Sequence, residues 1–144
     1  MSGQRLAGAG LVLLLLGLLP ACSSDRERQA RAMSGGGDPP RGAAAIRSYG
    51  CGSCHQIPGV AGARGLVGPP LADWLQRASL AGHLPNTPEN LVHWIQHPQH
   101  ERPGTIMPEM SVTDGDARDI AAYLYTVHER PSQQAREVVS EASA

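Results

Sequence analysis

The chain has 144 residues and a formal net charge of −1, which is enough for one small domain. All 12 of its basic residues other than histidine are arginine, and without the first residues a small acidic excess remains, so the charge does not support nucleic-acid binding. The chain contains no Phe, two Trp and three Tyr, so few large side chains are available to fill an interior. This composition favours a domain whose core is completed by a bound apolar group.

Residues 1–21 predict a signal peptide of the lipoprotein type. One cation, Arg5, precedes an apolar run from Leu11 to Leu19, which is too short to span a bilayer as a helix of about 20 residues. The run ends in Leu19-Pro20-Ala21-Cys22, which resembles a bacterial lipoprotein signal whose cleavage leaves a lipidated N-terminal cysteine, although Pro20 is unusual there. An ordinary cleaved signal peptide with Cys22 incidental is the alternative. Lipidation of Cys22 would also explain the odd number of cysteines.

Three further segments are expected after the signal. Residues 22–40 begin with the lipidated cysteine and continue as a flexible tether, because they are polar, charged and rich in Gly without an apolar period. Residues 41–129 are expected to form the folded domain. Residues 130–144 are a polar tail that buries little. The organisation predicts a bacterial protein on the extracytoplasmic (periplasmic) side, anchored to the membrane through Cys22.

Inside the folded domain we expect helices joined by loops, and no segment alternates cleanly enough to predict a strand. The helix start at Thr87-Pro88-Glu89-Asn90 is well marked, with Thr as the cap, Pro at the first position and Glu in the first turn. The fold class is therefore all-α. The four predicted helices cover residues 41–49, 70–80, 88–97 and 114–128.

The segment Cys51-Gly52-Ser53-Cys54-His55 has the Cys-x-x-Cys-His spacing of a c-type haem attachment site. Each thiol can add to one vinyl group of the haem, and His55 is then held beside the iron as the proximal ligand. A bare Cys-x-x-Cys also occurs in zinc and thiol-redox sites, so a non-haem metal or redox module using these residues is the alternative. A histidine directly after the second cysteine, in a chain with an export signal, favours haem.

Two loops, residues 56–69 and 98–112, are long for a domain of this size. Long loops in a compact domain are usually functional. The first loop follows His55, and the second contains Met107 and Met110. The two loops could therefore cover a flat cofactor from both sides.

The chain resembles a class I c-type cytochrome over roughly residues 42–127. The closing helix, residues 116–125, is similar to that of bacterial oxidase-associated and lipoprotein members. The resemblance implies an all-α, cytochrome c-like fold of three to five helices wrapped around one covalently bound haem c. The matching segments, in the order of the family, are Cys51 to His55, Gly68-Pro69, Pro103-Gly104-Thr105-Ile106-Met107 and the last helix with Tyr123.

The resemblance also implies the second axial ligand of the iron. The family's methionine maps onto Met107, which is followed by Pro108. Met110 is the fallback, because it lies three residues away and its thioether could also reach the iron. A second histidine on the iron is the remaining alternative, with His83, His93, His97, His100 and His128 as candidates.

Other positions are assigned by the same resemblance. The Pro69 carbonyl matches the family's acceptor for the second ring N–H of His55, a bond that fixes the tautomer. Trp74, Arg77 and Trp94 are candidates for contacts with the haem or its propionates, while the ordinary alternative for the tryptophans is core packing.

Four residues match the crossing of the first and last helices in the family. Gly42 and Ile46 lie four apart on the first helix, and Ile120 and Tyr123 are their expected partners on the last. We interpret these four as helix packing and not as part of the site.

With His55 and Met107 both bound, the iron would have no open position, so the resemblance implies an electron-transfer protein and not an enzyme. The expected partners are membrane-bound electron-transfer proteins of the respiratory chain: a terminal oxidase, a quinol-oxidising complex or a dehydrogenase. The chain would be a tethered monomeric carrier or an electron-entry subunit fixed in such a complex. A haem enzyme or gas sensor, with Met107 off the iron and an external ligand bound, is the alternative.

Overall fold

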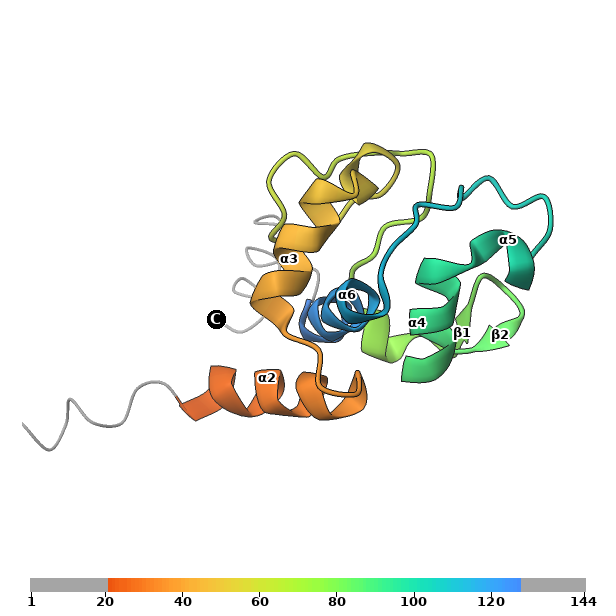
Figure 1. Cartoon of the computed structure of the whole chain (residues 1–144). Helices are drawn as coiled ribbons and strands as arrows, with labels where there is room; N and C mark the ends of the chain where they lie inside the picture. The colour runs from red at the N-terminus through yellow and green to blue at the C-terminus, as the bar shows by residue number, and fades with distance from the viewer. Residues whose placement is uncertain (1–20, 128–144) are drawn as a thin grey trace, which may run out of the picture.

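The computed structural model describes residues 21–127, so the predicted signal peptide before Ala21, the tail of residues 130–144 and His128 lie outside the described residues. The described residues form five α-helices and a small two-stranded antiparallel ladder, and the all-α prediction is confirmed. The ladder lies at one edge of the domain beside α4 and α5 (Figure 1). The elements are α2 (Ala21–Met33), α3 (Pro39–Ser48), η1 (Cys51–Ser53), η2 (Trp74–Gln76), β1 (Ser79–Leu80), β2 (Leu84–Pro85), α4 (Pro88–Gln96), α5 (Pro98–Glu101) and α6 (Asp114–Thr126).

Helices α3 and α6 form the main packing contact of the domain. They cross so closely at Gly42 that a β-carbon there would lie 2.0 Å from the carbonyl oxygen of Asp119. Ile46 and Ile120 are both buried beside this crossing, and Tyr123 also lies against Gly42. The structure therefore agrees with the helix packing that the resemblance implied, and it fixes the position of the segment that follows α3.

A buried carboxylate joins the start of α3 to the middle of α6. Asp119 is 6 % exposed, and its side chain accepts hydrogen bonds from the Asp38 backbone N–H at 2.6 Å and from Arg41 Nε at 2.9 Å. The hydrogen bond to Asp119 raises the pKa of the Arg41 guanidinium. Because the carboxylate has both a backbone and a cationic donor, its burial does not leave an unpaired charge.

The predicted threonine cap of α4 is present, and α6 begins with a threonine cap of the same kind. Thr87 accepts a hydrogen bond from the Asn90 backbone N–H at 3.2 Å, and Thr113 accepts one from Asp116 at the same distance. The hydroxyls of Thr113 and Tyr49 both donate to the Asp116 carboxylate. Both hydrogen bonds lower the pKa of Asp116, and the one from Thr113 has the larger effect. The Tyr49 contact connects the end of α3 to the start of α6.

The helix predicted over residues 70–80 is wrong. Asp73 has a φ of 51°, a left-handed backbone conformation that interrupts any helix starting before it. Only η2 and β1 form in this segment. The Asn86 side chain donates to the carbonyls of Trp74 and Arg77 at 2.8 and 3.0 Å, so it satisfies backbone groups that a continued helix would have used.

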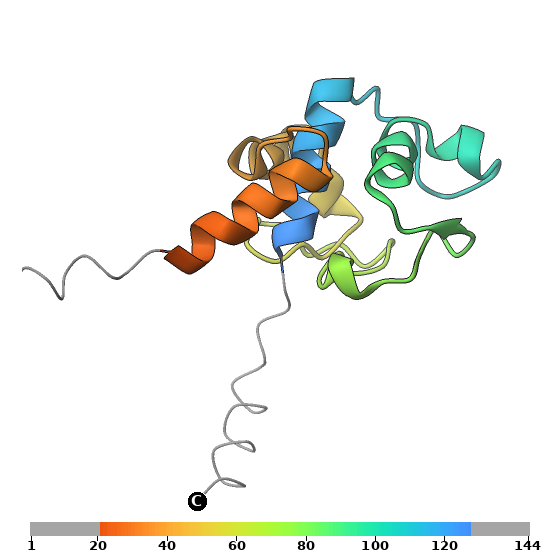
Figure 2. The same ribbon diagram turned by 90° about the horizontal axis from the view of Figure 1, so that it is seen from below.

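The flexible tether predicted over residues 22–40 is also not what the structure shows. Helix α2 lies beside α6 in both views (Figures 1 and 2), and Ala30 is 2 % exposed in the core. Ser34 is buried and donates to the Ala30 carbonyl at 2.8 Å, while Arg31 pairs with Asp38 at 2.8 Å. The burial of Ala30, the Ser34 hydrogen bond and the Arg31–Asp38 ion pair hold this segment in place, so the folded part begins well before residue 41.

No helix within residues 21–127 combines the length and the apolar character that crossing a bilayer requires.

Candidate haem-binding site

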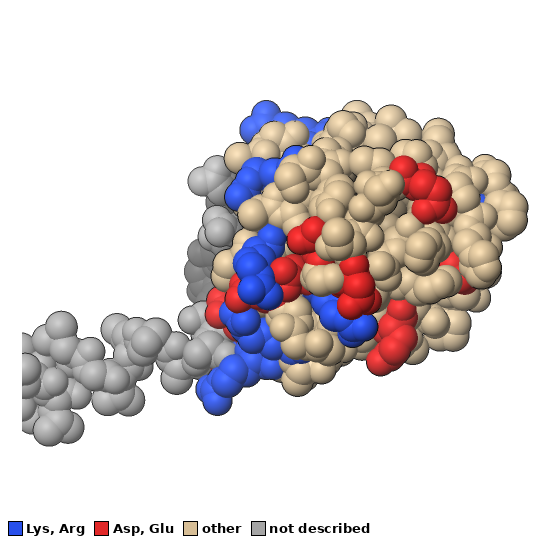
Figure 3. Space-filling view, in the orientation of Figure 1, with Lys and Arg blue, Asp and Glu red and all other residues tan. Residues whose placement is uncertain are grey.

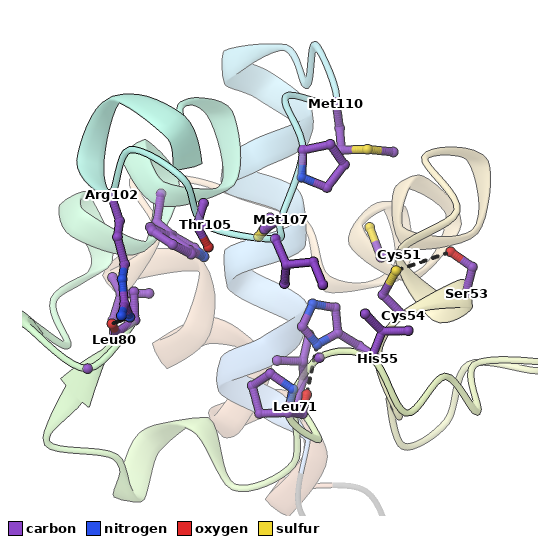
Figure 4. Close-up of a pocket in the computed structure, with 18 of the residues that line it drawn as sticks. Cys51, Ser53, Cys54, His55, Leu71, Leu80, Arg102, Thr105, Met107 and Met110 are labelled. Carbon is purple, nitrogen blue, oxygen red and sulfur yellow. Dashed lines mark hydrogen bonds between the residues drawn. The ribbon is translucent and has the colours of Figure 1, made fainter.

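A cavity of about 710 Å³, the haem cavity, opens between the segment that follows α3 and the loop that precedes α6. This volume lies in the range of small-molecule and cofactor sites. Figure 4 shows Cys51 and Cys54 on one side of it and Arg102 and Leu80 on the other. The cavity brings together all the residues proposed for haem binding and axial ligation, namely Cys51, Cys54, His55, Pro69, Trp74, Arg77, Trp94, Met107 and Met110.

The two cysteines lie on one tight turn. The backbone N–H groups of Cys54 and His55 both donate to the Cys51 carbonyl, at 3.2 and 3.0 Å, so the three side chains are held together. Both cysteines are half-buried free thiols, and burial raises the pKa of Cys51. Thiols that are close, unpaired and at the cavity wall are what two thioether bonds to one macrocycle need.

The His55 ring is fixed by its two neighbours in the first long loop. Its Nδ1 lies 2.7 Å from the Pro69 carbonyl, which can only accept, so Nδ1 carries the proton and Nε2 has a free lone pair. This is the contact that the resemblance implied. A β-carbon at Gly68 would lie 2.3 Å from Cε1 of His55, so only glycine lets the loop pass this close to the ring. The arrangement suits an imidazole that binds a metal through Nε2.

The opposite end of the cavity carries positive charge. The Arg77 guanidinium lies 4.9 Å from the centre of the Trp74 ring and donates to the Ala72 carbonyl at 3.1 Å. Arg102 donates to the Ala81 carbonyl at 3.0 Å. Among the described residues, neither arginine forms an ion pair with a carboxylate.

A buried polar group of Trp74 lies beside the Tyr125 hydroxyl. The indole N–H of Trp74 is buried without a hydrogen-bond acceptor among the described residues; the Tyr125 hydroxyl is close by, but no bond of normal geometry joins them. A carboxylate bound at this end could accept hydrogen bonds from the two arginines. The cavity thus fits haem, because apolar walls suit the macrocycle, the thiols and His55 suit its attachment, and the cationic end suits its propionates.

The loop that carries the two methionines is held by Gln99. Its Nε2 donates to the carbonyls of Thr105 at 2.7 Å and Met107 at 2.8 Å, and its Oε1 accepts from the Gly104 N–H at 3.2 Å. Both methionines line the cavity, but Met110 packs against the hydrophobic core and Met107 is not among the described side chains that do so. The Met107 thioether is therefore the one of the two that core packing does not engage.

The sequence did not single out Arg102 or Gln99. Arg102 immediately precedes the Pro103-Gly104 turn before Met107. Because the chain has no lysine, an arginine next to the methionine loop was the available sign of a cation near the site. Gln99 had no such signal, because its three hydrogen bonds depend on how the loop folds back over α5.

The alternatives that use other ligands are less well supported. His83, His93, His97 and His100 are all absent from the lining of the haem cavity, and His128 lies outside the described residues. Among the described residues, Cys51, Cys54 and His55 do not belong to any group whose ligand atoms lie close enough together to hold a metal ion without haem.

Together, the cavity, the paired thiols and the fixed imidazole define a protein of the c-type haem class. A family model described as cytochrome c matches residues 40–128, which is more than half of the chain. The chain therefore belongs to the cytochrome c family, and its cofactor is a covalently bound haem c.

One curated relative is cytochrome c oxidase subunit 2 of Alkalihalophilus pseudofirmus, to which the chain is 35 % identical over 75 residues. The match includes 51 % of this chain and 21 % of the relative, so the chain spans about a fifth of that protein's length. No solved structure matches the chain at a significant level.

Proposed function

We propose that the chain is a one-electron carrier in which His55 and Met107 hold the haem iron from its two faces. Family membership supports haem-based electron transfer. The observation that carries the finer proposal is that one cavity contains both a fixed imidazole with a free Nε2 and a methionine on a separately held loop. A bound haem c supplies an iron that takes up or releases one electron, and a thioether ligand favours the ferrous state.

The contribution of the chain is to keep both ligands in place while the charge changes. The Pro69 carbonyl orients the His55 ring, and Gln99 holds the backbone of Met107. Tyr123 donates to the Pro58 carbonyl at 2.7 Å and so fixes the loop after His55 onto α6. Ligands with fixed backbones move little between oxidation states, which favours rapid electron transfer.

An apolar surface at the mouth of the cavity supports transient docking. Val67 and Ile106 line the cavity and are 59 % and 77 % exposed, and Leu66 beside Val67 is 82 % exposed. Figure 3 shows that most basic atoms on this face lie over α2 and α3, away from α4 and α5. Weak electron-transfer encounters have small interfaces, below about 1,200 Å² in total. We place the exchange of electrons at this mouth.

The proposed partners are membrane-bound. The relative whose name is cytochrome c oxidase subunit 2 supports association with an oxidase, either as a shuttle or as a fixed electron-entry subunit. A quinol-oxidising complex or a dehydrogenase could supply the electrons. The chain itself is proposed to be an electron-transfer protein without a bond-making activity of its own.

Carbon monoxide binding tests this proposal against a ligand-binding haem enzyme or sensor. If Met107 occupies the sixth position, the ferrous protein should bind carbon monoxide slowly and incompletely at neutral pH, because the thioether has to leave first. Stopped-flow spectroscopy of the reduced holoprotein measures the rate. Rapid, complete binding would overturn the electron-carrier proposal in favour of an open iron.

The membrane anchor is a separate proposal that rests on Cys22, the second residue of α2. Cys22→Ser should release the protein from the membrane and leave haem incorporation unchanged, because Cys22 is remote in sequence from the attachment motif. Fractionation of cells with haem staining of each fraction measures both effects. If the variant stays in the membrane pellet, an uncleaved signal or a bound partner anchors the chain instead of a lipid.

A further inference from the structure

Three potential metal ligands converge outside the haem cavity, where α4 meets α5. His93 lies in the last turn of α4, and His100 and Glu101 are the last two residues of α5. One ligand atom of each residue lies within 4.8 Å of the other two. We call these three residues the His–Glu cluster.

We propose that the His–Glu cluster binds a divalent transition-metal ion, with Zn²⁺ as the best match. Two imidazoles and one carboxylate are ligands that Zn²⁺ accepts in tetrahedral sites with three protein ligands and one water. The nitrogen-rich set disfavours Ca²⁺ and Mg²⁺, which prefer oxygen ligands.

The distances are close to those of such a site. At metal–ligand bonds of 2.0–2.2 Å, tetrahedral ligand atoms lie roughly 3.3–3.6 Å apart. The Glu101 Oε1 atom is 3.3 Å from Nδ1 of His100 and 2.7 Å from Nδ1 of His93. The second distance would have to open by less than about 1 Å for one ion to enter. The ligand atoms of His93 and His100 lie within 4.8 Å of each other, so they too are within reach of one ion after a small adjustment.

The same two distances distinguish the cluster from an ordinary ion pair. The only hydrogen bond between the side chains of these described residues joins Glu101 Oε1 to Nδ1 of His100, and at 3.3 Å it is long. Nδ1 of His93 lies closer to the same oxygen, at 2.7 Å, but this contact is not among the hydrogen bonds of the described residues. Two imidazoles therefore converge on one carboxylate oxygen, and neither forms a short, well-directed hydrogen bond with it. A shared cation would satisfy all three groups.

The cluster is accessible and already fixed by the backbone. The side chains of His93 and His100 are 47 % and 78 % exposed, so an ion can enter from solvent. The His97 N–H donates to the His93 carbonyl at 2.8 Å, and the Glu101 N–H donates to the His97 carbonyl at 3.2 Å. These bonds set the angle between α4 and α5. His97 is not one of the converging ligands, so water takes the fourth position.

Metal binding to the His–Glu cluster also reaches the methionine loop. Gln99, which holds the Met107 carbonyl, precedes His100 on α5. A metal ion that bridges α4 and α5 would restrict α5 and therefore the backbone of Met107. This link rests on the proposed function, because it requires Met107 to be an iron ligand, whereas the metal site does not.

Zinc binding to the full-length holoprotein tests the site directly. Competition with a chromophoric chelator should show one Zn²⁺ per chain, and the double variant His93→Gln/His100→Gln should bind about tenfold more weakly or worse. Zinc-edge X-ray absorption should report only nitrogen and oxygen ligands, at about 2.0–2.2 Å. An unchanged haem spectrum in the variant shows that the fold is intact.

Glu101→Gln and Glu89→Gln provide a matched pair of controls. Both remove a carboxylate, but exposed Glu89 lies in the first turn of α4, at the end opposite His93. Glu101→Gln should weaken zinc binding, and Glu89→Gln should leave it unchanged. Equal affinity of the wild type and the double variant, or sulfur among the zinc ligands, would overturn the proposal.

The link to the methionine loop has its own measurement. Bound Zn²⁺ should slow the association of carbon monoxide with the ferrous protein, and the double variant should lose this effect. Equal rates with and without Zn²⁺ in the wild type, at saturation of the site, would overturn the link to the methionine loop and would leave the zinc site itself standing.

Discussion

Met107→Ala is expected to abolish the weak sulfur-to-iron charge-transfer band of the oxidised protein and to lower its reduction potential by on the order of 0.1 V or more. Loss of the thioether removes the ligand that favours the ferrous state and opens the position to water. Visible spectroscopy of the oxidised protein measures the first effect, and a potentiometric titration measures the second.

Met110→Ala is the matched control, because it removes the other thioether that lines the same cavity. Its side chain packs against the core, so its loss should reduce stability while the charge-transfer band and the potential stay near wild-type values. The reverse result, with the band lost in Met110→Ala and kept in Met107→Ala, would move the sixth ligand to Met110. The Gln99 contacts to the Met107 backbone would then position the loop and not the ligand itself.

The parts of the fold that could be predicted are those with local causes. The capping threonines Thr87 and Thr113 each accept from the backbone N–H three positions later, so the starts of α4 and α6 follow from short stretches of sequence. The segment over residues 70–80 had a helical spacing of apolar residues, but the left-handed backbone at Asp73 interrupts a helix there. Local geometry decided against periodicity there.

Helix α2 could not be predicted because its burial depends on a distant partner. Its buried residue is Ala30, which by itself carries little apolar signal, and Met33 at its end is partly buried against the core. The segment is ordered by contact with α6, about ninety residues later in the chain. Composition alone therefore suggested a tether where the structure has a packed helix.

The candidate site divides in the same way. The spacing of Cys51, Cys54 and His55 on one turn is a local requirement of haem attachment, so the motif alone predicted it. Arg102 and Gln99 acquire their roles only when the loop before α6 folds over the cavity, and no spacing rule connects them to His55. Side chains whose function comes from long-range geometry need the structure to be recognised.

The second large effect is expected from Gly42→Ala, which should lower the free energy of unfolding of the holoprotein by about 3 kcal/mol. The added β-carbon would lie 2.0 Å from the Asp119 carbonyl oxygen and 2.9 Å from Cβ of Tyr123. The nearest atom belongs to the backbone of α6, so it cannot rotate away, and α3 and α6 must separate. Separation also lengthens the hydrogen bond from the Asp38 N–H to the Asp119 carboxylate.

Gly115→Ala separates this packing effect from the helix propensity of alanine, which is about 1 kcal/mol better than that of glycine in a helix interior. Gly115 lies in α6, and a β-carbon there would have no described atom within 4 Å, so this change should be neutral or stabilising. Urea unfolding followed by far-UV circular dichroism measures both variants. The gain in helix propensity is the same kind of term in both variants. A Gly42→Ala protein as stable as Gly115→Ala would therefore show that α3 and α6 do not approach as closely as the structure has them. The segment carrying His55 would then be positioned by other contacts.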